Sequence, residues 1–343
     1  MVVPIRLSVR RDAEQEAKPD WPSWLFPGWY AAAIAKDIKP GALKPITIAG
    51  KELILFRTES GAPAIMDRYC VHQGTSLALG RVQGERLRCA FHHWEYAVDG
   101  ACVRIPECTK IPPRARIRTY PTTERCGLIW IHVGADRPES GPLPSRSLRA
   151  EEGWRLVRVT DMGPVNTTCR DIFENIVDTA HLQPLHQVKS VSPLLEFEGR
   201  DDGFWTRFGA YETHGRPIAR GGLSVVYAPS IWHTELKGSF MSKWLEHESA
   251  WTLALQPIGP AENHCFSAIH VRCDRFEAWQ RILGATVEKM WSIGIREDVR
   301  MWRNKIVQES PVLCANDGPI MTWRKWWASQ EELARNVHQN GQG

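Results

Sequence analysis

The sequence predicts an α+β protein in two parts: a domain of short strands, followed by a domain that combines an antiparallel sheet with a long helix. Three observations support this prediction. Short runs of β-branched and aromatic residues, separated by turn residues, fill the first third of the chain. Similar runs return between about 204 and 271, and a segment with helical spacing of apolar residues follows at 276–308. Strands followed by a long helix favour a sheet that the helix covers on one face.

The first domain is expected to be all-β. Lys-Pro-Gly, Ala-Gly-Lys and Glu-Ser-Gly turns separate its apolar runs. The segment 96–105 has Asp-Gly at its centre, which is typical of a tight hairpin turn. Pro and Ser accumulate through 135–147, which predicts a linker. The other expected strands lie at residues 29–35, 43–49, 52–58, 62–67 and 127–134.

The second domain is expected to begin near Trp154 and to contain two helices, at roughly 169–182 and 276–308. Its other strands are expected at residues 204–211, 223–228, 249–258 and 264–271. The apolar residues that predict the buried face of the longer helix are Trp279, Ile282, Leu283, Val287, Met290, Trp291, Ile295 and Met301. We therefore divide the chain into an arm at 1–20, a first domain at 21–140 and a second domain at 141–343.

Composition excludes several classes of function. The chain has 43 basic and 39 acidic residues, and a net charge of only +4 argues against a dedicated nucleic-acid binder. The first residues lack the apolar core of a signal peptide, and no run of 18 apolar residues occurs, so we expect no membrane span. The nine cysteines have no regular spacing, and apart from Cys70 and Cys89 we expect them to be reduced, partly buried thiols in a cytoplasmic protein.

The first chemical motif is Cys70-x-His72 followed by Cys89-x2-His92. A Rieske [2Fe–2S] cluster needs two cysteines on one iron and two histidines on the other, and each half of this motif supplies one of each. The imidazoles raise the reduction potential above that of an all-cysteine cluster, which suits an electron relay. A Cys2His2 zinc site is the alternative, although zinc fingers usually pair like with like.

The second motif is Asp178-x2-His181-x4-His186. Asp178 and His181 are three residues apart, so a helix would place them on one face. Pro184 should end or bend that helix, which would let His186 return toward His181. Two imidazoles and one carboxylate make the facial triad of non-heme Fe(II) oxygenases, which leaves coordination positions open for O2.

These motifs carry a family resemblance. The stretch RYCVHQGTSLALGRVQGERLRCAFHHWEYAVDGACVRIP resembles the Rieske domain of Rieske non-heme iron oxygenases. The family usually has Pro after the second Cys and Gly after the second His, where this chain has Ala90 and His93. The resemblance implies a Rieske domain followed by a helix-grip (START-like) catalytic domain.

The same resemblance implies a third iron ligand far downstream. The Asp-x2-His-x4-His run is similar to the family's iron-binding segment, in which Asn175 could also reach the metal. We expect Asp298 to be this ligand, with Glu297 as the competing choice, because the sequence around Asp298 resembles the branch of 3-ketosteroid 9-alpha-hydroxylases and cholesterol 7-desaturases. The residues that match this branch are Glu297, Asp298, Trp302, Lys305, Pro311, Asp317, Gly318, Pro319 and Trp323.

Partners follow from the same likeness. In the family, the Asp before the first iron His bridges subunits, which would join Asp178 to His92 of a neighbouring chain and implies a head-to-tail homotrimer. No dinucleotide-binding fingerprint occurs, so electrons from NAD(P)H should arrive through a separate reductase or ferredoxin. O2 is the expected co-substrate. A Rieske electron carrier without oxygen chemistry is the rival from another class.

The substrate is expected to be a small organic molecule with a bulky, flat, apolar ring system. The reaction is expected to be of the monooxygenase type. The FHHW segment is similar to the arylamine N-oxygenase aminopyrrolnitrin oxygenase, whereas the last third resembles steroid-ring hydroxylases. Hydroxylation, N-oxygenation, demethylation, desaturation and cyclisation therefore stay open. Candidate residues for the substrate pocket are Phe204, Trp205, Phe208, Tyr211, Tyr227, Trp232, Trp244 and Trp251.

Overall fold

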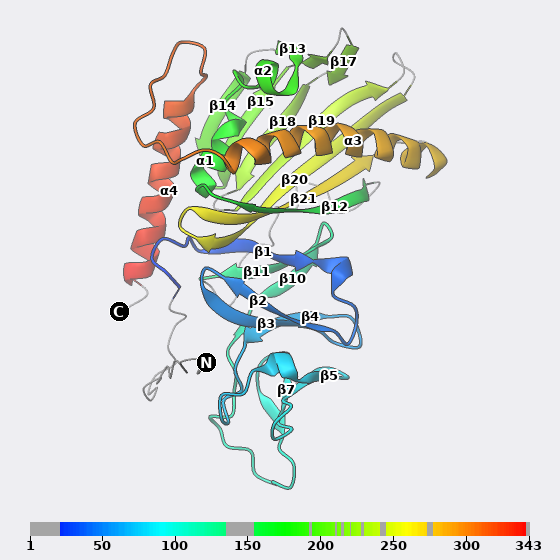
Figure 1. The fold of residues 1–343 in the computed structure, drawn as a ribbon, viewed down its shortest axis with the longest axis vertical. Coiled ribbons are helices and arrows are strands. Elements are labelled where there is room, and N and C mark those ends of the chain that lie inside the picture. The colour runs from blue at the N-terminus through cyan, green and yellow to red at the C-terminus, as the bar shows by residue number, and fades with distance from the viewer. Residues whose placement is uncertain are drawn as a thin grey trace, which may run out of the picture.

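The structure is a computed structural model with two domains stacked along the long axis of the molecule (Figure 1). It describes residues 21–134 and 154–340, with gaps at 192–193, 210, 214–215, 220, 228–229, 241–244 and 273–276. The expected arm at 1–20, the linker at 135–147, the boundary at 140/141, Cys273 and Trp244 lie outside the described residues, as do the side chains of Tyr211 and Trp279.

The N-terminal domain is all-β, as its sequence predicted, and the structure divides its strands among three antiparallel sheets. One sheet has the order β1 (Gly28–Ile34), β11 (Leu128–Val133), β10 (Thr122–Arg125). A second has the order β2 (Leu43–Ile48), β3 (Lys51–Arg57), β4 (Pro63–Asp67), β9 (Thr119–Tyr120). The third has the order β5 (Arg81–Gln83), β6 (Arg86–Arg88), β7 (Glu95–Ala97), β8 (Cys102–Arg104), and two short 3-10 helices are η1 (Ala35–Asp37) and η2 (Leu77–Leu79).

Strand β3 explains how this domain is packed. Its apolar run is buried on both faces, because alternate side chains enter two different cores. Leu53 and Leu55 pack in the core near β1 and β11. Ile54 and Phe56 pack in the second core, which also contains the cysteines of the first motif. The second core therefore supports the segments that carry the cluster ligands.

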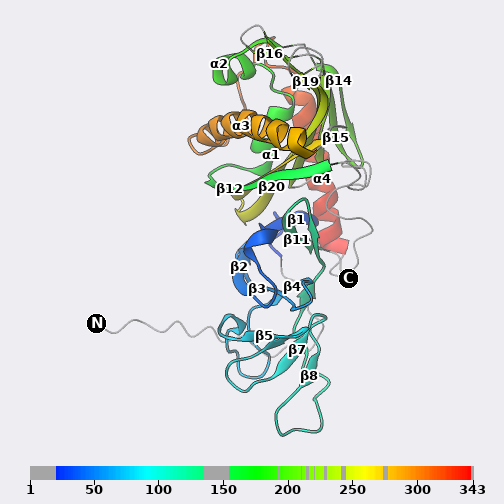
Figure 2. The same ribbon diagram turned by 90° about the vertical axis from the view of Figure 1, so that its right-hand side faces the viewer.

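The C-terminal domain is built on a seven-stranded antiparallel sheet that α3 crosses on one face (Figures 1 and 2). Its strands in sheet order are β12 (Trp154–Val165), β21 (Glu262–Arg272), β20 (Leu245–Gly259), β19 (Ile231–Phe240), β18 (Gly221–Tyr227), β15 (Gly203–Phe208) and β14 (Leu194–Arg200). A smaller sheet has the order β13 (Val188–Val191), β16 (Tyr211–Thr213), β17 (Arg216–Ala219). The helices are α1 (Cys169–Phe173), the 3-10 turn η4 (Glu174–Ile176), α2 (Leu182–His186), α3 (Glu277–Trp302) and α4 (Ile320–Asn340).

The two faces of the large sheet have different partners. On β20, Trp251 and Leu253 belong to the core that α3 and α4 close. Ala250 and Ala254 face the other way and pack with Ala31 and other residues of β1 and β11. Trp205 and Tyr227 also pack in this second cluster, so the structure removes them from the candidates for a pocket under α3.

The predicted helix at 169–182 is wrong as a single element. Thr168 begins α1 by accepting a hydrogen bond from the Asp171 amide on its side-chain oxygen, but the helix ends at Phe173 and continues only as η4. The long helix is confirmed over Glu277–Trp302, with Leu283, Val287 and Ile295 buried, but its predicted end at 303–308 is not helical. Ile282 and Met301 are exposed, against expectation, because they point away from the sheet.

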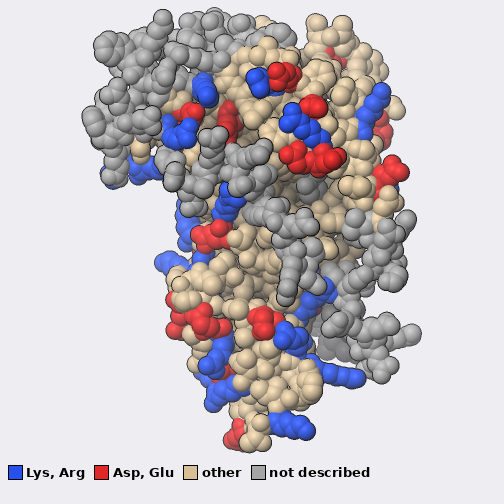
Figure 3. Space-filling model, turned by 180° about the vertical axis from the view of Figure 1, so that it is seen from behind, with Lys and Arg blue, Asp and Glu red and all other residues tan. Residues whose placement is uncertain are grey.

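Helix α4 was missed by the sequence reasoning. Its buried residues Ile320, Trp323, Trp327 and Ala334 have helical spacing and are the signal that would have found it. All eight described cysteines are free thiols, but Cys108 and Cys314 are exposed rather than partly buried. No helix in the described part of the chain has both the length and the apolar character that crossing a membrane requires. Figure 3 shows acidic and basic side chains interspersed over the back face.

Candidate metal centres

The first centre is formed by two loops with matching backbone geometry. In the first loop, the Cys70 amide donates to the Thr75 carbonyl at 2.9 Å. In the second, the Cys89 amide donates to the Trp94 carbonyl, also at 2.9 Å. Each hydrogen bond closes a loop over five residues, so each cysteine and the histidine that follows it are held in one tight turn. The sequence predicted one Cys and one His from each loop, and this is how the structure arranges them.

The four predicted ligands gather at one place. Cys70 and Cys89 are buried, at 3% and 1% exposure, and the rings of His72 and His92 lie 4.5 Å apart between centroids. The Nδ1 atom of His72 is buried and has no hydrogen-bond partner among the described residues. Burial raises the pKa of the Cys70 thiol. Two buried thiols beside two imidazoles, one with an orphaned nitrogen, fit a [2Fe–2S] cluster.

Two aromatic residues that sequence reasoning missed support these ligands. The Trp94 ring stacks on His72, with centroids 4.4 Å apart and an interplanar angle of 9°. The Tyr96 hydroxyl lies 3.0 Å from the Cys70 sulfur. Trp94 lies just before β7 and Tyr96 is the middle residue of that strand, so the two alternate with Glu95, and this alternation after His92 was the available signal.

His93 occupies the place where the family usually has Gly. Its φ is +60°, in the left-handed region that favours glycine. Gly74 holds the corresponding left-handed position in the first loop, with φ of +71°. The His93 side chain is exposed. The departure from the family pattern thus changes a residue at a turn and leaves the four ligands in place.

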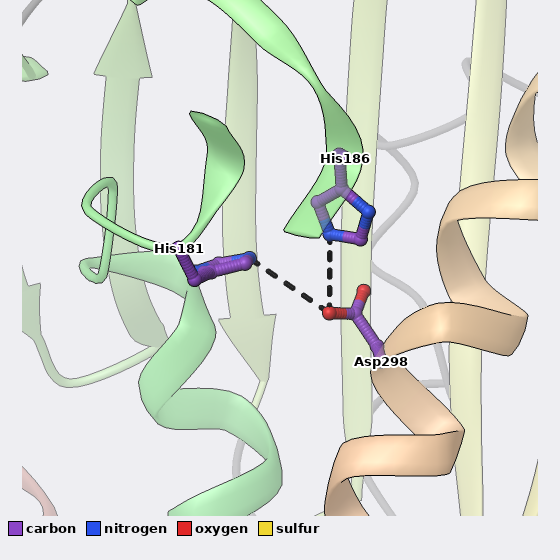
Figure 4. A group of neighbouring side chains, drawn as sticks. All are labelled: His181, His186 and Asp298. Atoms are coloured by element: carbon purple, nitrogen blue, oxygen red, sulfur yellow. Dashed lines mark hydrogen bonds and ion pairs between the residues drawn. The ribbon is translucent and has the colours of Figure 1, made fainter. Parts of the chain in front are cut away.

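The second centre brings together residues from α2 and α3 (Figure 4). The Nε2 atom of His186 lies 3.2 Å from Oδ1 of Asp298, and Nε2 of His181 lies 3.8 Å from the same oxygen. One potential ligand atom from each residue lies within 4.8 Å of the others. Two imidazoles and a carboxylate at this spacing fit a facial triad for a single iron.

The chain forms this pair of histidines differently from the prediction. His181 precedes α2 and His186 is its last residue, so the offset of five spans one short helix. Pro184 lies inside this helix and does not end it, because a proline in the first turn lacks only an amide that would have no partner there. The helix ends instead at Gln187, which has a left-handed conformation.

Asp298 and Glu297, the two competing ligands, lie on different sides of His186. Oε2 of Glu297 lies 2.8 Å from Nδ1 of His186, the nitrogen that faces away from Asp298. A carboxylate on Nδ1 fixes the tautomer that leaves Nε2 free for a metal. Burial alone would lower the pKa of His186, but its hydrogen bonds to Asp298 and Glu297 outweigh burial and raise it. Asn175 donates to Oδ1 of Asp298 at 3.3 Å.

Asp178 lies on the outer side of His181. Its Oδ2 is 3.3 Å from Nδ1 of His181, although that nitrogen makes no hydrogen bond of good geometry within the described residues. Oδ1 accepts hydrogen bonds from the amides of Ala180 and His181 at 3.0 and 3.4 Å. Burial would raise the pKa of Asp178, but these contacts with His181 and Ala180 lower it. Asp178 is therefore an anion held against the first predicted iron ligand.

The two centres are far apart within one chain. The β5–β8 sheet, which flanks the cluster loops, lies at one end of the molecule, and α2 lies at the opposite end (Figure 2). Electron transfer between them within a single chain would have to cross both domains.

The chain matches two family models that together cover most of its length. Residues 28–121 match the Rieske [2Fe-2S] domain. Residues 129–330, more than half of the chain, match the 3-Ketosteroid 9alpha-hydroxylase C-terminal domain.

Similar proteins agree with these matches. A 3-ketosteroid-9-alpha-monooxygenase oxygenase component from Rhodococcus rhodochrous is 28% identical over 320 residues, with 89% of this chain and 80% of the relative covered. A cholesterol 7-desaturase from Xenopus laevis is 27% identical, with 93% and 74% covered. Among solved structures, Pseudomonas putida NdmA with caffeine has a TM-score of 0.70 at 19% identity, with 93% of this chain and 95% of that chain covered.

These matches confirm the predicted fold class, the enzyme class and the cofactors. The chain is an O2-dependent oxidoreductase with a Rieske [2Fe–2S] cluster and a mononuclear iron, and a separate reductase supplies its electrons. It belongs to the Rieske non-heme iron oxygenases, and within them to the family defined by the 3-ketosteroid 9alpha-hydroxylase C-terminal domain.

Proposed function

We propose that this chain is the oxygenase component of a monooxygenase that oxidises a bulky, apolar ring substrate beside His181, His186 and Asp298. The observation that carries this proposal is the group of three potential ligand atoms within 4.8 Å of one another. The rival function, a Rieske electron carrier without oxygen chemistry, has no need of such a group. When bound, the cluster relays single electrons and the iron activates O2.

In this proposal, Cys70, His72, Cys89 and His92 hold the cluster, and His181, His186 and Asp298 hold the iron. Glu297 orients His186 through its Nδ1 atom, and Asn175 orients Asp298 by a hydrogen bond. These two outer contacts orient His186 and Asp298 before the metal arrives.

Asp178 is the proposed link between subunits. One of its oxygens faces His181, and its side chain is 28% exposed, so another chain can reach it. We assign its partner as His92 of a neighbouring chain, in a head-to-tail homotrimer. The separation of the two centres in Figure 2 supports transfer between chains rather than within one. The other six described cysteines form no disulfide, which favours a cytoplasmic, reducing location.

We propose the substrate class from the aromatic side chains that lie between the large sheet and α3. Trp251 stacks on Trp291 of α3 at 5.4 Å and 11°, and Trp232 meets Trp251 edge to face at 5.1 Å. Phe208 and Leu236 extend this apolar surface along the sheet. Flat aromatic walls favour a flat, apolar ring. The named relatives act on, or are solved with, ring compounds such as ketosteroids, cholesterol and caffeine.

The decisive experiment is product analysis with labelled O2. The purified chain, loaded with both metals and supplied with a reductase, would be offered steroids, arylamines and polycyclic pyrroles. One labelled oxygen atom in a ring product supports the proposal, and a labelled N-oxide would select the N-oxygenase alternative. An iron content of about two per chain rather than about three, with no labelled product, would instead identify the electron carrier.

A further inference from the structure

We infer that Arg324 of α4 is a positioning residue for the iron site. Through Glu174 it fixes the turn that carries Asn175 and leads into Asp178 and His181. The inference rests on the proposed iron ligands, because positioning is defined relative to them. Arg324 touches none of those ligands itself.

The contact between Arg324 and Glu174 is a two-pronged ion pair. Nε lies 2.6 Å from one carboxylate oxygen of Glu174, and a terminal nitrogen lies 3.1 Å from the other. Both side chains are only 12% exposed, and 150 positions separate them in the chain. A planar guanidinium that bonds both oxygens fixes the direction of the carboxylate as well as its position. Removing one partner would leave the other charge largely buried without a counter-charge.

Glu174 in turn shapes the backbone that leads to the site. Its carbonyl accepts hydrogen bonds from the amides of Val177 and Asp178, at 3.1 and 3.2 Å. The next residue, Asn175, donates to Asp298. Holding Glu174 therefore holds the residue that contacts one predicted ligand and the turn that places Asp178 against another.

The remaining nitrogen of Arg324 holds the segment that connects α3 to α4. It donates to the carbonyls of Gln308 and Glu309 at 2.9 and 3.2 Å. The Glu309 carboxylate is also paired with Arg170 of α1 at 2.9 Å. One guanidinium thus ties together α4, the η4 turn and the segment that follows the helix carrying Asp298.

Gly318 shows independently that the segment between α3 and α4 packs closely against the turn that leads from η4 to Asp178. Its φ is +70°, and a Cβ atom there would lie 2.5 Å from the carbonyl oxygen of Val177. Only glycine accommodates both the left-handed backbone and this close approach. The segment between α3 and α4 therefore packs directly on the residue before Asp178.

Together these contacts fix the relative position of His181 and Asp298, which come from distant parts of the sequence. A ligand set that its supporting contacts hold in place binds metal more tightly than one that must be ordered on binding. Losing the ion pair should therefore weaken the metal site even though every ligand remains.

The test uses Arg324→Gln in the full chain, with the cluster loaded and the mononuclear iron removed. Co²⁺ is titrated into this protein, and isothermal titration calorimetry measures its binding without any need for turnover. We expect Arg324→Gln to weaken Co²⁺ binding roughly 10- to 100-fold. Arg324→Lys keeps the positive charge but cannot bond both oxygens of Glu174 at once. Its affinity for Co²⁺ should therefore lie between those of the wild type and Arg324→Gln. The double variant Glu174→Gln/Arg324→Gln should bind Co²⁺ no more weakly than either single variant, because both changes remove the same ion pair.

Two controls separate positioning from general stability. Arg335→Gln changes an exposed arginine on the same helix and should bind Co²⁺ like the wild type. Trp326→Phe weakens the packing of α4 on Gly199 and Phe204 without touching Glu174, so it should lower the melting temperature and spare Co²⁺ binding. Unchanged affinity in Arg324→Gln, or an equal loss in Trp326→Phe, would overturn the inference. If His186→Ala binds Co²⁺ as tightly as wild type, the proposed iron site fails instead.

Discussion

The two metal centres of this chain are built on opposite principles. The cluster ligands lie in two successive loops between short strands, and each loop is closed by the same kind of backbone hydrogen bond. The iron ligands are His181 just before α2, His186 at the end of α2 and Asp298 on α3, and His186 and Asp298 are 112 positions apart in the sequence. One centre is formed by local turns, and the other depends on how the whole second domain is folded.

Burial follows the same division. The cluster cysteines are at most 3% exposed and belong to a hydrophobic core. The side chains of His181 and His186 are 18% and 13% exposed, and a set of polar neighbours holds them. The cluster is therefore protected by packing, whereas the iron site is positioned by hydrogen bonds and charges. Changes at the two centres should have separable consequences.

The largest expected effect is the complete and selective loss of one centre. Cys89→Ser should abolish the Rieske spectrum, because it removes a buried thiolate ligand that no neighbour can replace. His181→Ala should abolish turnover and leave that spectrum unchanged, because the ligand belongs to the other domain. Visible absorption, the electron-spin signal of the reduced cluster and the product assay measure these outcomes.

His264 supplies the control for this pair of changes. It is a histidine of the catalytic domain that contacts Asp161 and lies in neither centre, so His264→Ala should keep both the spectrum and turnover. If His181→Ala also bleached the cluster, the two centres would not be structurally independent.

Asp178→Asn tests whether the two centres communicate between chains. The amide keeps the shape of the side chain but removes the negative charge beside His181, so both metals should remain. We expect the reduced cluster to be reoxidised roughly 10- to 100-fold more slowly on mixing with substrate and O2. Stopped-flow absorption measures this rate. Asp202→Asn, at an exposed turn that accepts a hydrogen bond from Trp205, is the control, and equal rates in the two variants would contradict the bridging role.

The cluster centre could be predicted from the sequence because its information is local. Cys70, His72, Cys89 and His92 lie in two short motifs, and loop spacing alone indicated the cluster type. The third iron ligand could not be found in this way, since nothing near Asp298 marks it as a neighbour of His186. Its assignment depended on a family resemblance, and the structure then placed Glu297 on the outer nitrogen of the same histidine.

The predictions that were wrong or missed also concern features that depend on contacts between distant parts of the chain. The helix at 169–182 was predicted from local propensity, but the chain has to turn so that Asn175 reaches α3. Trp205 was a pocket candidate because strand alternation does not reveal which face meets the other domain. Glu174 and Arg324 were missed because their partnership exists only after α4 has packed. Tertiary contacts decided each of these features.

The next largest effect concerns Glu95, a buried carboxylate in the cluster domain. Arg104 and Arg86 contact its two oxygens at 2.6 and 2.9 Å. Burial would raise the pKa of Glu95, but these hydrogen bonds and charges hold it below its usual range. A depressed pKa in the folded state gives stability that is present above the unfolded value, about 4.3, and is lost as the pH falls through the folded value.

Glu95→Gln should therefore lower the free energy of unfolding by about 2 kcal/mol at neutral pH. The variant should also lose less stability than wild type as the pH falls below about 4.3. Urea unfolding at a series of pH values measures both. Glu196→Gln, in an exposed pair with Arg207, is the control. If Glu95→Gln and wild type lost the same free energy of unfolding below this pH, the depressed pKa of Glu95 would be contradicted.

Glu297→Gln addresses the iron centre at a smaller scale. The amide can still bond Nδ1 of His186 but no longer carries the charge that strengthens this imidazole as a ligand. We expect about tenfold weaker Co²⁺ binding to the iron-depleted protein, with the cluster spectrum unchanged. If Glu297 rather than Asp298 were the ligand, Asp298→Asn would be the milder of the two changes, and comparing the two titrations decides between them.

His93→Gly is the smallest and most local test of the cluster loops. The residue has a left-handed backbone and an exposed side chain, so glycine should relieve strain without removing a contact. We expect the free energy of unfolding to rise by about 0.5–1 kcal/mol, with no change in spectrum or turnover. Glu107→Gly, at another left-handed position in the same domain, is the matched comparison. If His93→Gly lost turnover and Glu107→Gly did not, the His93 side chain itself would be needed for activity. The cluster centre would then depend on residues beyond its four ligands.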